Sequence, residues 1–314
     1  MKRVLTAVIL IPIVVLALFR APLWLFAPLV LGVALLAARE YFDIAEKTGY
    51  RPMRVLGYIA TGYIFLISAG LTTSFDLSGF FLMALFISTL PVALIAFVML
   101  AAHMRRQSPA TGLPDVGISL LSLAYVAAPL SVLVVVRSVY GLGSLFLLFL
   151  MLIVWAGDIT AFYVGRSLGR HKLAPRISPG KTWEGALGSV VASVIVGVLL
   201  FHFGAHIETA FARIHLLAPG NYPLVLDPQR SGTVIVPFKG AMWLVVLFAL
   251  CVNVAAQIGD LVESSLKRGA GLKDSGSLLP GHGGVLDRID ALLFALPVGF
   301  VFCALGLWWM LMPI

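Results

Sequence analysis

The sequence predicts an all-α integral membrane protein, a polytopic bundle of about nine transmembrane helices. Hydrophobic residues make up 61% of the 314 residues and charged residues only 11%, whereas soluble domains contain roughly 45 to 50% apolar residues. The apolar runs are continuous rather than alternating, and many are about twenty residues long. This pattern is typical of membrane helices and not of barrel strands.

Nine apolar runs are long enough to cross a hydrocarbon core of roughly 30 Å. The first follows two basic residues and lacks a small-x-small cleavage motif, so we expect a retained helix and not a signal peptide. Cys251 and Cys303 both fall inside apolar runs and are interpreted as packing residues. The spans are expected at 4–19, 22–38, 56–71, 79–102, 116–136, 143–165, 184–204, 240–260 and 289–312.

The distribution of basic residues predicts a cytoplasmic N-terminus. With this orientation, 17 of the 22 Lys and Arg residues face the cytoplasm, as the positive-inside rule requires. A basic inner face is attracted to anionic membrane lipids, so the net charge of +8 needs no nucleic-acid partner. The other side receives Arg20, Arg137, Arg213, Arg230 and Lys239.

Acidic residues gather near the cytoplasmic ends of the last four spans. Ionisable groups at membrane depth are costly unless they are paired, hydrated or metal-bound, so they are functional candidates. The polar site is therefore expected in residues 141–314, and the helices of residues 1–140 complete a single membrane domain. The acidic residues concerned are Asp158, Glu184, Asp260, Glu263, Asp274, Asp287 and Asp290.

One face of the eighth helix combines acids with a cation. Asp260, Glu263 and Lys267 are spaced at i, i+3 and i+7, with Ser264 at i+4, so they share a helical face. Asp287, at the start of the last helix, is expected to face Asp260. Carboxylates at adjacent helix ends suit a hard divalent cation. The alternatives are an N-cap role for Asp287 and an i, i+4 pair between Glu263 and Lys267.

The glycine-rich run PGHGG precedes the last helix. His282 lacks the further His or Cys ligands that zinc requires, so we expect it to hydrogen-bond a phosphate or to shape the loop. The flanking glycines allow backbone N–H groups to approach an anion. A glycine-rich turn without a ligand is the alternative.

A second polar stretch lies at residues 165–188. Its PGKT run is not a Walker A loop, because Pro175 stands where that motif needs glycine. Ser178, Lys181, Thr182 and Glu184 lie at the start of a helix, an arrangement that can hold a triphosphate. The alternative is an ordinary basic loop on the cytoplasmic side.

Three segments resemble the phosphatidate cytidylyltransferases, the CDP-diacylglycerol synthases. They are SSLKRGAGLKDSGSLLPGHGGVLDRID (264–290), WAGDITAFYVGRSLGRHKLAPRISPGKTWEG (155–185) and NVAAQIGDLVES (253–264). The resemblance implies transfer of CMP from CTP to phosphatidic acid at the cytoplasmic side of the inner membrane, by a multi-pass enzyme that forms a homodimer.

The resemblance also implies a divalent cation, Mg²⁺ or Mn²⁺, with room for a second cation. Asp260 and Asp287 would belong to the metal centre, and Glu263 is a further candidate ligand from its place on the same face. The other signature positions are Lys267, Arg268, Lys273, Asp274 and His282, and those of the second motif are Ser178, Lys181, Thr182 and Glu184.

Two alternative functions remain open. Another CTP-dependent lipid enzyme, such as a polyprenol kinase, would transfer the γ-phosphoryl group in place of CMP. A transporter would place its acids around the midplane in two similar halves, whereas here they gather on one side of the second half. Asp158 is expected either to support the metal shell or to pair with a cation. Asp274 and Asp290 receive no assigned role, and the segment 205–239 receives no function.

Overall fold

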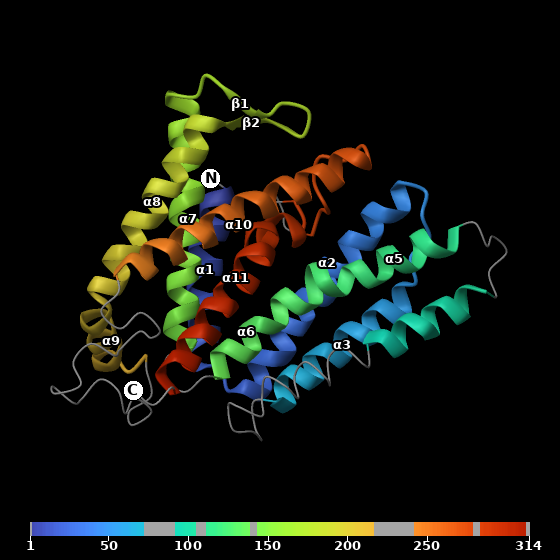
Figure 1. Cartoon of the computed structure of the whole chain (residues 1–314), viewed down its shortest axis with the longest axis horizontal. Coiled ribbons are helices and arrows are strands. Elements are labelled where there is room, and N and C mark those ends of the chain that lie inside the picture. Colours follow the sequence, from blue (N-terminus) through green and yellow to red (C-terminus); the bar gives the residue numbers. More distant parts are fainter. Residues whose placement is uncertain are drawn as a thin grey trace.

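The computed structural model describes residues 2–71, 92–104, 111–138, 143–216, 242–278 and 283–311. Helices dominate these residues (Figure 1). The N-terminal half contains α1 (Lys2–Arg20), α2 (Leu23–Lys47), α3 (Arg54–Leu71), α5 (Gly112–Ser122), the π-helical turn η2 (Leu123–Ala127) and α6 (Ala128–Ser138). The C-terminal half contains α7 (Gly143–Ser167), α8 (Trp183–His202), α9 (Gly204–Arg213), α10 (Met242–Gly269) and α11 (Leu286–Leu311).

Six helices in the described part of the chain are long and apolar enough to cross a membrane. The chain is therefore a multi-pass membrane protein with a helical architecture, as the sequence predicted. The six segments are Leu23–Lys47, Gly112–Ser138, Gly143–Ser167, Trp183–His202, Met242–Gly269 and Leu286–Leu305. Three shorter apolar helices lie at Ile11–Arg20, Arg54–Gly70 and Val92–His103. The expected span at 79–102 lies outside the described residues up to residue 91, so nine spans stay a prediction.

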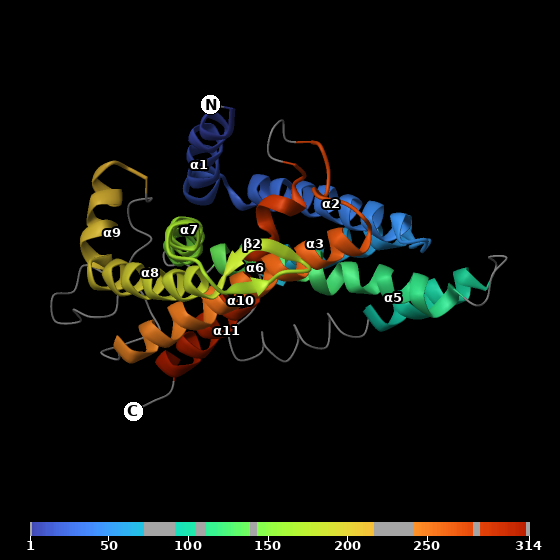
Figure 2. The same cartoon turned by 90° about the horizontal axis from the view of Figure 1, so that it is seen from above.

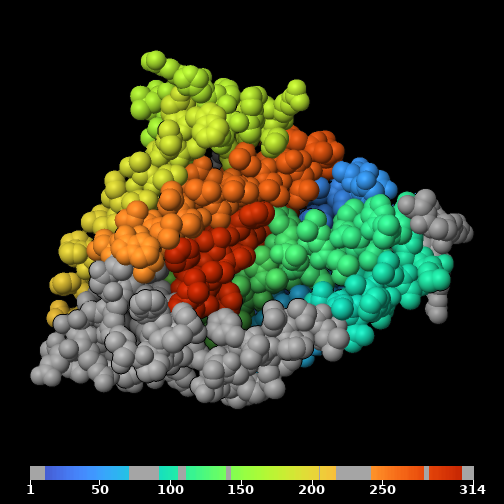
Figure 3. Space-filling model, in the orientation of Figure 1, coloured from blue at the N-terminus to red at the C-terminus, as the bar shows by residue number. Residues whose placement is uncertain are grey.

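A short antiparallel hairpin departs from the expected all-α fold. Strand β1 (Lys172–Ala174) pairs with β2 (Ser178–Thr182), and the hairpin projects beyond the helices above α10 (Figures 1, 2 and 3). Pro175 and Pro179 interrupt this stretch; proline removes a backbone donor and blocks a continuous helix. The chain therefore crosses from α7 to α8 as a hairpin.

The main hydrophobic core runs through both halves of the chain. It begins at Leu18 in α1, takes in most of the first half of α7 and ends at Leu296 in α11. The expected division between residues 140 and 141 lies outside the described residues, within 139–142. One core includes residues from both sides of this division. The helices of the first half therefore pack against those that carry the polar site.

A buried polar network joins α7, α8 and α10 at membrane depth. Asn253 donates to Ser189 and Ser193, each at 2.8 Å, and Ser193 donates to the carbonyl oxygen of Ile153 at 2.8 Å. A Cβ atom on Gly157 would come within 2.4 Å of Asn253 Nδ2, so a side chain here would displace the network. The network places the start of α8 beside α10.

Candidate functional site

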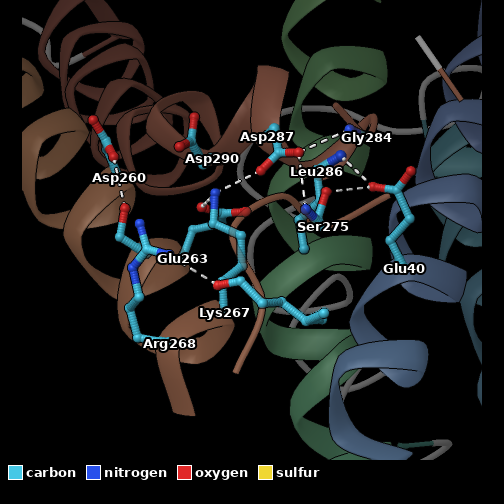
Figure 4. Close-up of polar contacts among 12 residues, drawn as sticks. Glu40, Asp260, Glu263, Lys267, Arg268, Ser275, Gly284, Leu286, Asp287 and Asp290 are labelled. Carbon is cyan, nitrogen blue, oxygen red and sulfur yellow. Dashed lines mark hydrogen bonds and ion pairs between the residues drawn. The ribbon is translucent and has the colours of Figure 1, made fainter. Parts of the chain in front are cut away.

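The candidate site lies where α10 ends and α11 begins, with the hairpin above α10 (Figure 1). Figure 4 shows its polar contacts. Helices α10 and α11 cross closely at Gly259. A Cβ atom on this glycine would lie only 2.5 Å from the carbonyl oxygen of Asp290. The crossing brings the acids of two helices to one region, as the sequence predicted. Their contacts divide them into two groups.

The first group is built around Lys267. Its ammonium lies 2.6 Å from Asp287 Oδ1 and 2.5 Å from Glu263 Oε2. Glu263 is fully buried, and 12% of the Lys267 side chain is exposed. The i, i+4 pair between Glu263 and Lys267, which the sequence offered as the alternative to a ligand role, is present. The same lysine also binds the acid of the last helix. One buried cation thus neutralises part of the charge of two carboxylates.

Backbone N–H groups hold the second oxygen of Asp287. Asp287 lies in the first turn of α11, and its Oδ2 accepts from Ser275 N at 2.9 Å and from Gly284 N at 2.7 Å (Figure 4). Gly283 has a φ of 77°, and a Cβ atom there would lie 2.4 Å from Asp287 Oδ2. The backbone conformation and the close approach both favour glycine. The glycine-rich loop therefore brings N–H groups to an anion, and that anion is a carboxylate of the chain itself.

Glu40, in α2, holds the same loop from the other side and was missed by the sequence reasoning. Its Oε1 accepts from Val285 N at 2.9 Å, and its Oε2 accepts from Leu286 N and from Ser275 Oγ, each at 2.8 Å (Figure 4). A local signal existed, because apolar Ala37 and Ile44 lie at i−3 and i+4 on the same helical face. An acid on an apolar face calls for a partner.

The second group links the hairpin to α10. Lys181 Nζ, at the end of β2, lies 2.7 Å from Asp260 Oδ2, and Ser264 Oγ lies 3.3 Å from Asp260 Oδ1. Asp260 and Asp287 thus have different cationic partners, and Figure 4 draws Asp290 between them. No direct contact joins Asp260 to Asp287 in the described part of the chain, and their placement on facing helices around one metal stays a prediction.

The other predicted residues of the second motif build the junction between hairpin and helix. Thr182 is the N-cap of α8, and its Oγ1 accepts from Gly185 N at 3.1 Å. Glu184 Oε1 lies 2.6 Å from His171 Nδ1, at the base of the hairpin. Ser178 pairs with Ala174 in the strand register. Within the described residues, Lys181 is the member of this motif that contacts α10 through a charged side chain.

Two further acids adjoin Asp260. Asp158 in α7 and Asp290 in α11 both lie close enough to Asp260 for electrostatic interaction. Asp158 also interacts electrostatically with Lys181. Asp290 Oδ1 accepts from Ala291 N at 2.8 Å. Carboxylates from α7 and α11 therefore lie near Asp260 of α10, which gives Asp158 and Asp290 a place in the site.

The other described signature residues lie at the rim. Arg268 donates from Nε to the carbonyl oxygen of Ile177 at 3.3 Å and from Nη1 to that of Leu272 at 3.1 Å, so it ties the hairpin to α10. Lys273 and Asp274 are exposed. His282 lies outside the described residues.

The donor set suits a hard cation that substrate helps to bind. No three side chains among Asp, Glu, His and Cys in the described ranges lie close enough to hold a metal ion by themselves. Mg²⁺ commonly uses one or two carboxylates, with water and substrate phosphates completing its coordination. Glu263 Oε1 is buried without a hydrogen-bond partner in this part of the chain, and Asp287 Oδ1 keeps an acceptor position beside its lysine. These oxygens fit such a cation.

Comparison with known proteins gives the family of the chain. The sequence profile described as "Cytidylyltransferase family" matches residues 1–306. A protein named phosphatidate cytidylyltransferase from Brucella abortus biovar 1 (strain 9-941) is 40% identical over 200 residues, which cover 64% of this chain and 58% of that protein. One of the same name from Staphylococcus saprophyticus is 38% identical over 184 residues, 59% of this chain and 57% of that protein.

The matched stretches span less than two thirds of these relatives' lengths. A third relative of the same name, from Haemophilus influenzae, is 39% identical over 155 residues, covering 49% of this chain and 44% of that protein. The profile, by contrast, extends over nearly the whole chain and includes α2, the hairpin, α10 and α11. The chain belongs to the cytidylyltransferase family.

Proposed function

We propose that this protein is a phosphatidate cytidylyltransferase, which transfers CMP from CTP to phosphatidic acid and releases pyrophosphate. The supporting observation is the pair of lysine–carboxylate groups at one end of the bundle. Lys181 contacts Asp260, and Lys267 contacts Asp287. A reaction between two polyanions needs such cations close together, and the family match supports a cytidylyl group as the unit transferred.

The chemistry requires positioning and charge neutralisation above all. An oxygen of the lipid phosphate is already anionic at neutral pH, so no protein nucleophile or strong base is needed. This oxygen forms a bond to the α-phosphorus of CTP, the bond from that phosphorus to the bridging oxygen breaks, and pyrophosphate leaves. Lys181 approaches from the hairpin and Lys267 from α10, so the two cations can neutralise different phosphates.

A divalent cation, Mg²⁺ or Mn²⁺, would be held by Asp260 and Asp287, with Glu263 as a further candidate ligand and room for a second cation. When bound, it supplies positive charge to the triphosphate. The residues of the chain do the rest. Lys267 keeps Asp287 and Glu263 together, while the loop N–H groups aim Asp287.

The other candidate residues surround this centre. We assign Lys181, Ser178, Thr182 and Glu184 to the CTP side, where Thr182 and Glu184 act by holding the junction between hairpin and α8. Phosphate contacts are proposed for Arg268, Lys273 and His282, and Asp274 belongs to the same signature.

In the cell, the proposed enzyme has nine spans, a cytoplasmic N-terminus and its site on the cytoplasmic side of the inner membrane. It acts as a homodimer among membrane lipids, without nucleic acid. Residues 141–314 form its catalytic region, and the helices of residues 1–140 support it.

The test is turnover of purified protein with phosphatidic acid, labelled CTP and Mg²⁺, with and without a chelator. Labelled CDP-diacylglycerol should form and should disappear with the chelator. Asp287→Asn should abolish turnover in correctly inserted protein, whereas Asp43→Asn, which alters an exposed acid paired with Arg54, should retain it. Near-normal turnover by Asp287→Asn would remove this aspartate from the mechanism.

A further inference from the structure

Glu40 is an almost fully buried acid with no cationic partner among the described residues. Only 7% of its surface is exposed, and it lies in the N-terminal half, 246 residues before Leu286. A buried carboxylate is costly unless hydrogen bonds satisfy its oxygens. Three donors, Val285 N, Leu286 N and Ser275 Oγ, satisfy this one.

Two of these donors belong to the start of α11. The first N–H groups of a helix have no partner within the helix, and the helix dipole favours negative charge there. Glu40 supplies both the acceptors and the charge from another helix, where a local N-cap side chain would ordinarily do so. Since α11 begins at Leu286, Glu40 fixes the point at which the last helix starts.

The third donor connects Glu40 to Asp287. Ser275 donates its hydroxyl to Glu40 Oε2 at 2.8 Å and its backbone N–H to Asp287 Oδ2 at 2.9 Å. One serine therefore bridges the two carboxylates (Figure 4). A shift of Glu40 would move Ser275 and, with it, one of the two N–H groups that aim Asp287.

The loop is shaped to admit Glu40. A Cβ atom on Gly276 would lie 2.6 Å from Glu40 Oε1, and one on Gly284 would lie 2.3 Å from Glu40 Oε2. Contacts this short exclude any side chain at either position unless the carboxylate moves. Gly276 and Gly284 thus leave the space that the Glu40 carboxylate of α2 occupies. The local sequence around these glycines does not reveal this role.

We infer that Glu40 is a positioning residue for the proposed reaction: it holds the start of α11 and, through Ser275, orients Asp287. The effect of Glu40 on catalysis rests on the proposed function. The anchoring of α11 by Glu40 is independent of that function. It extends the site to the N-terminal half of the chain.

The experiment compares Glu40→Gln with the wild-type full chain in detergent micelles or nanodiscs. In either orientation, the NH2 of the new amide would face a backbone N–H group, that of Val285 or that of Leu286. Two donors cannot bond to each other, so part of the anchor is lost. Hydrogen exchange of the Val285 and Leu286 amides should become faster. The kcat should fall by about 10- to 100-fold, the usual effect of losing a residue that orients a ligand, with little change in the KM for CTP.

Three variants sharpen the result. Glu46→Gln changes an exposed acid on the same helix and should match the wild type in both measurements. Glu40→Asp keeps the charge on a shorter side chain and should lie between Glu40→Gln and the wild type, which also gives a readout if Glu40→Gln folds poorly. Ser275→Ala keeps both bonds from α11 to Glu40 and should still lower kcat.

The outcomes separate this inference from the proposed function. Unchanged exchange in Glu40→Gln would overturn the anchoring, and faster exchange with unchanged kcat would overturn the positioning role. Normal kcat in Ser275→Ala would disprove the route through Ser275. If the wild type makes no cytidylyl lipid, the proposed function fails, while the exchange data still decide whether Glu40 anchors α11.

Discussion

Lys267 is the most exposed member of a buried cluster whose charges depend on it. Its ammonium contacts Glu263 and Asp287 within 2.6 Å, and the side chains of these acids are 0% and 5% exposed. Lys267→Met keeps the aliphatic volume and removes the charge. Two adjacent buried carboxylates would then face each other without a cation.

The expected loss of stability follows from this burial. Removing one partner of a buried ion pair costs about 3 to 5 kcal/mol, because the remaining charge stays desolvated. The free energy of unfolding should therefore fall by an amount in this range, measured by titrating the purified protein with SDS in mixed micelles. Lys47→Met, at the exposed end of α2, is the control and should stay within about 0.5 kcal/mol of the wild type.

A second substitution tests the electrostatic explanation. Glu263→Gln in the Lys267→Met background removes one of the two facing charges, and the new amide can donate to Asp287. At least half of the lost stability should return. The reasoning is refuted if Lys267→Met unfolds like the control, or if adding Glu263→Gln restores nothing.

Three other changes have distinct expected outcomes. Lys181→Ala removes a partly exposed ion pair with Asp260, so stability should change by less than about 1 kcal/mol while the KM for CTP rises; an unchanged KM would contradict the placement of CTP. Gly157→Ala would push a methyl group into Asn253 and Ser193 and should cost about 1 to 3 kcal/mol in unfolding, whereas Gly62→Ala, in open space, should not destabilise. Burial raises the pKa of Glu208 from 4.5 to about 7. Between these pH values the carboxyl group is ionised in the unfolded chain but still protonated in the folded one, so the free energy of unfolding should fall as the pH rises from 4.5 to 7. Glu208→Gln should abolish this fall when unfolding is measured as a function of pH.

The sequence predicted the local features of the site well. Helical periodicity placed Glu263 and Lys267 one turn apart, and the structure confirms their contact. Asp287 was expected at the start of the last helix, and it lies in the first turn of α11. These predictions succeeded because they depend on spacing within one helix.

The features that the sequence did not reveal depend on distant partners. The helical spacing of these residues could not show that Asp260 pairs with Lys181 and that Lys267 pairs with Asp287. These partners lie in the hairpin and in α11, outside the helix to which the spacing applies. Glu40 was overlooked because its partners lie more than 230 residues away. The hairpin was missed because a short polar stretch between two long helices carries no strand periodicity.

In the proposed function, this site joins the cytidylyl group of CTP to a lipid phosphate. The most direct measurement supplies CTP labelled with ³H in cytosine and with ³²P in the γ-phosphate to purified protein with phosphatidic acid and Mg²⁺. We predict that ³H enters the lipid fraction while ³²P leaves as pyrophosphate. Lipid that contains ³²P without ³H would indicate a kinase and contradict the proposed function. Lipid with neither label would also contradict it.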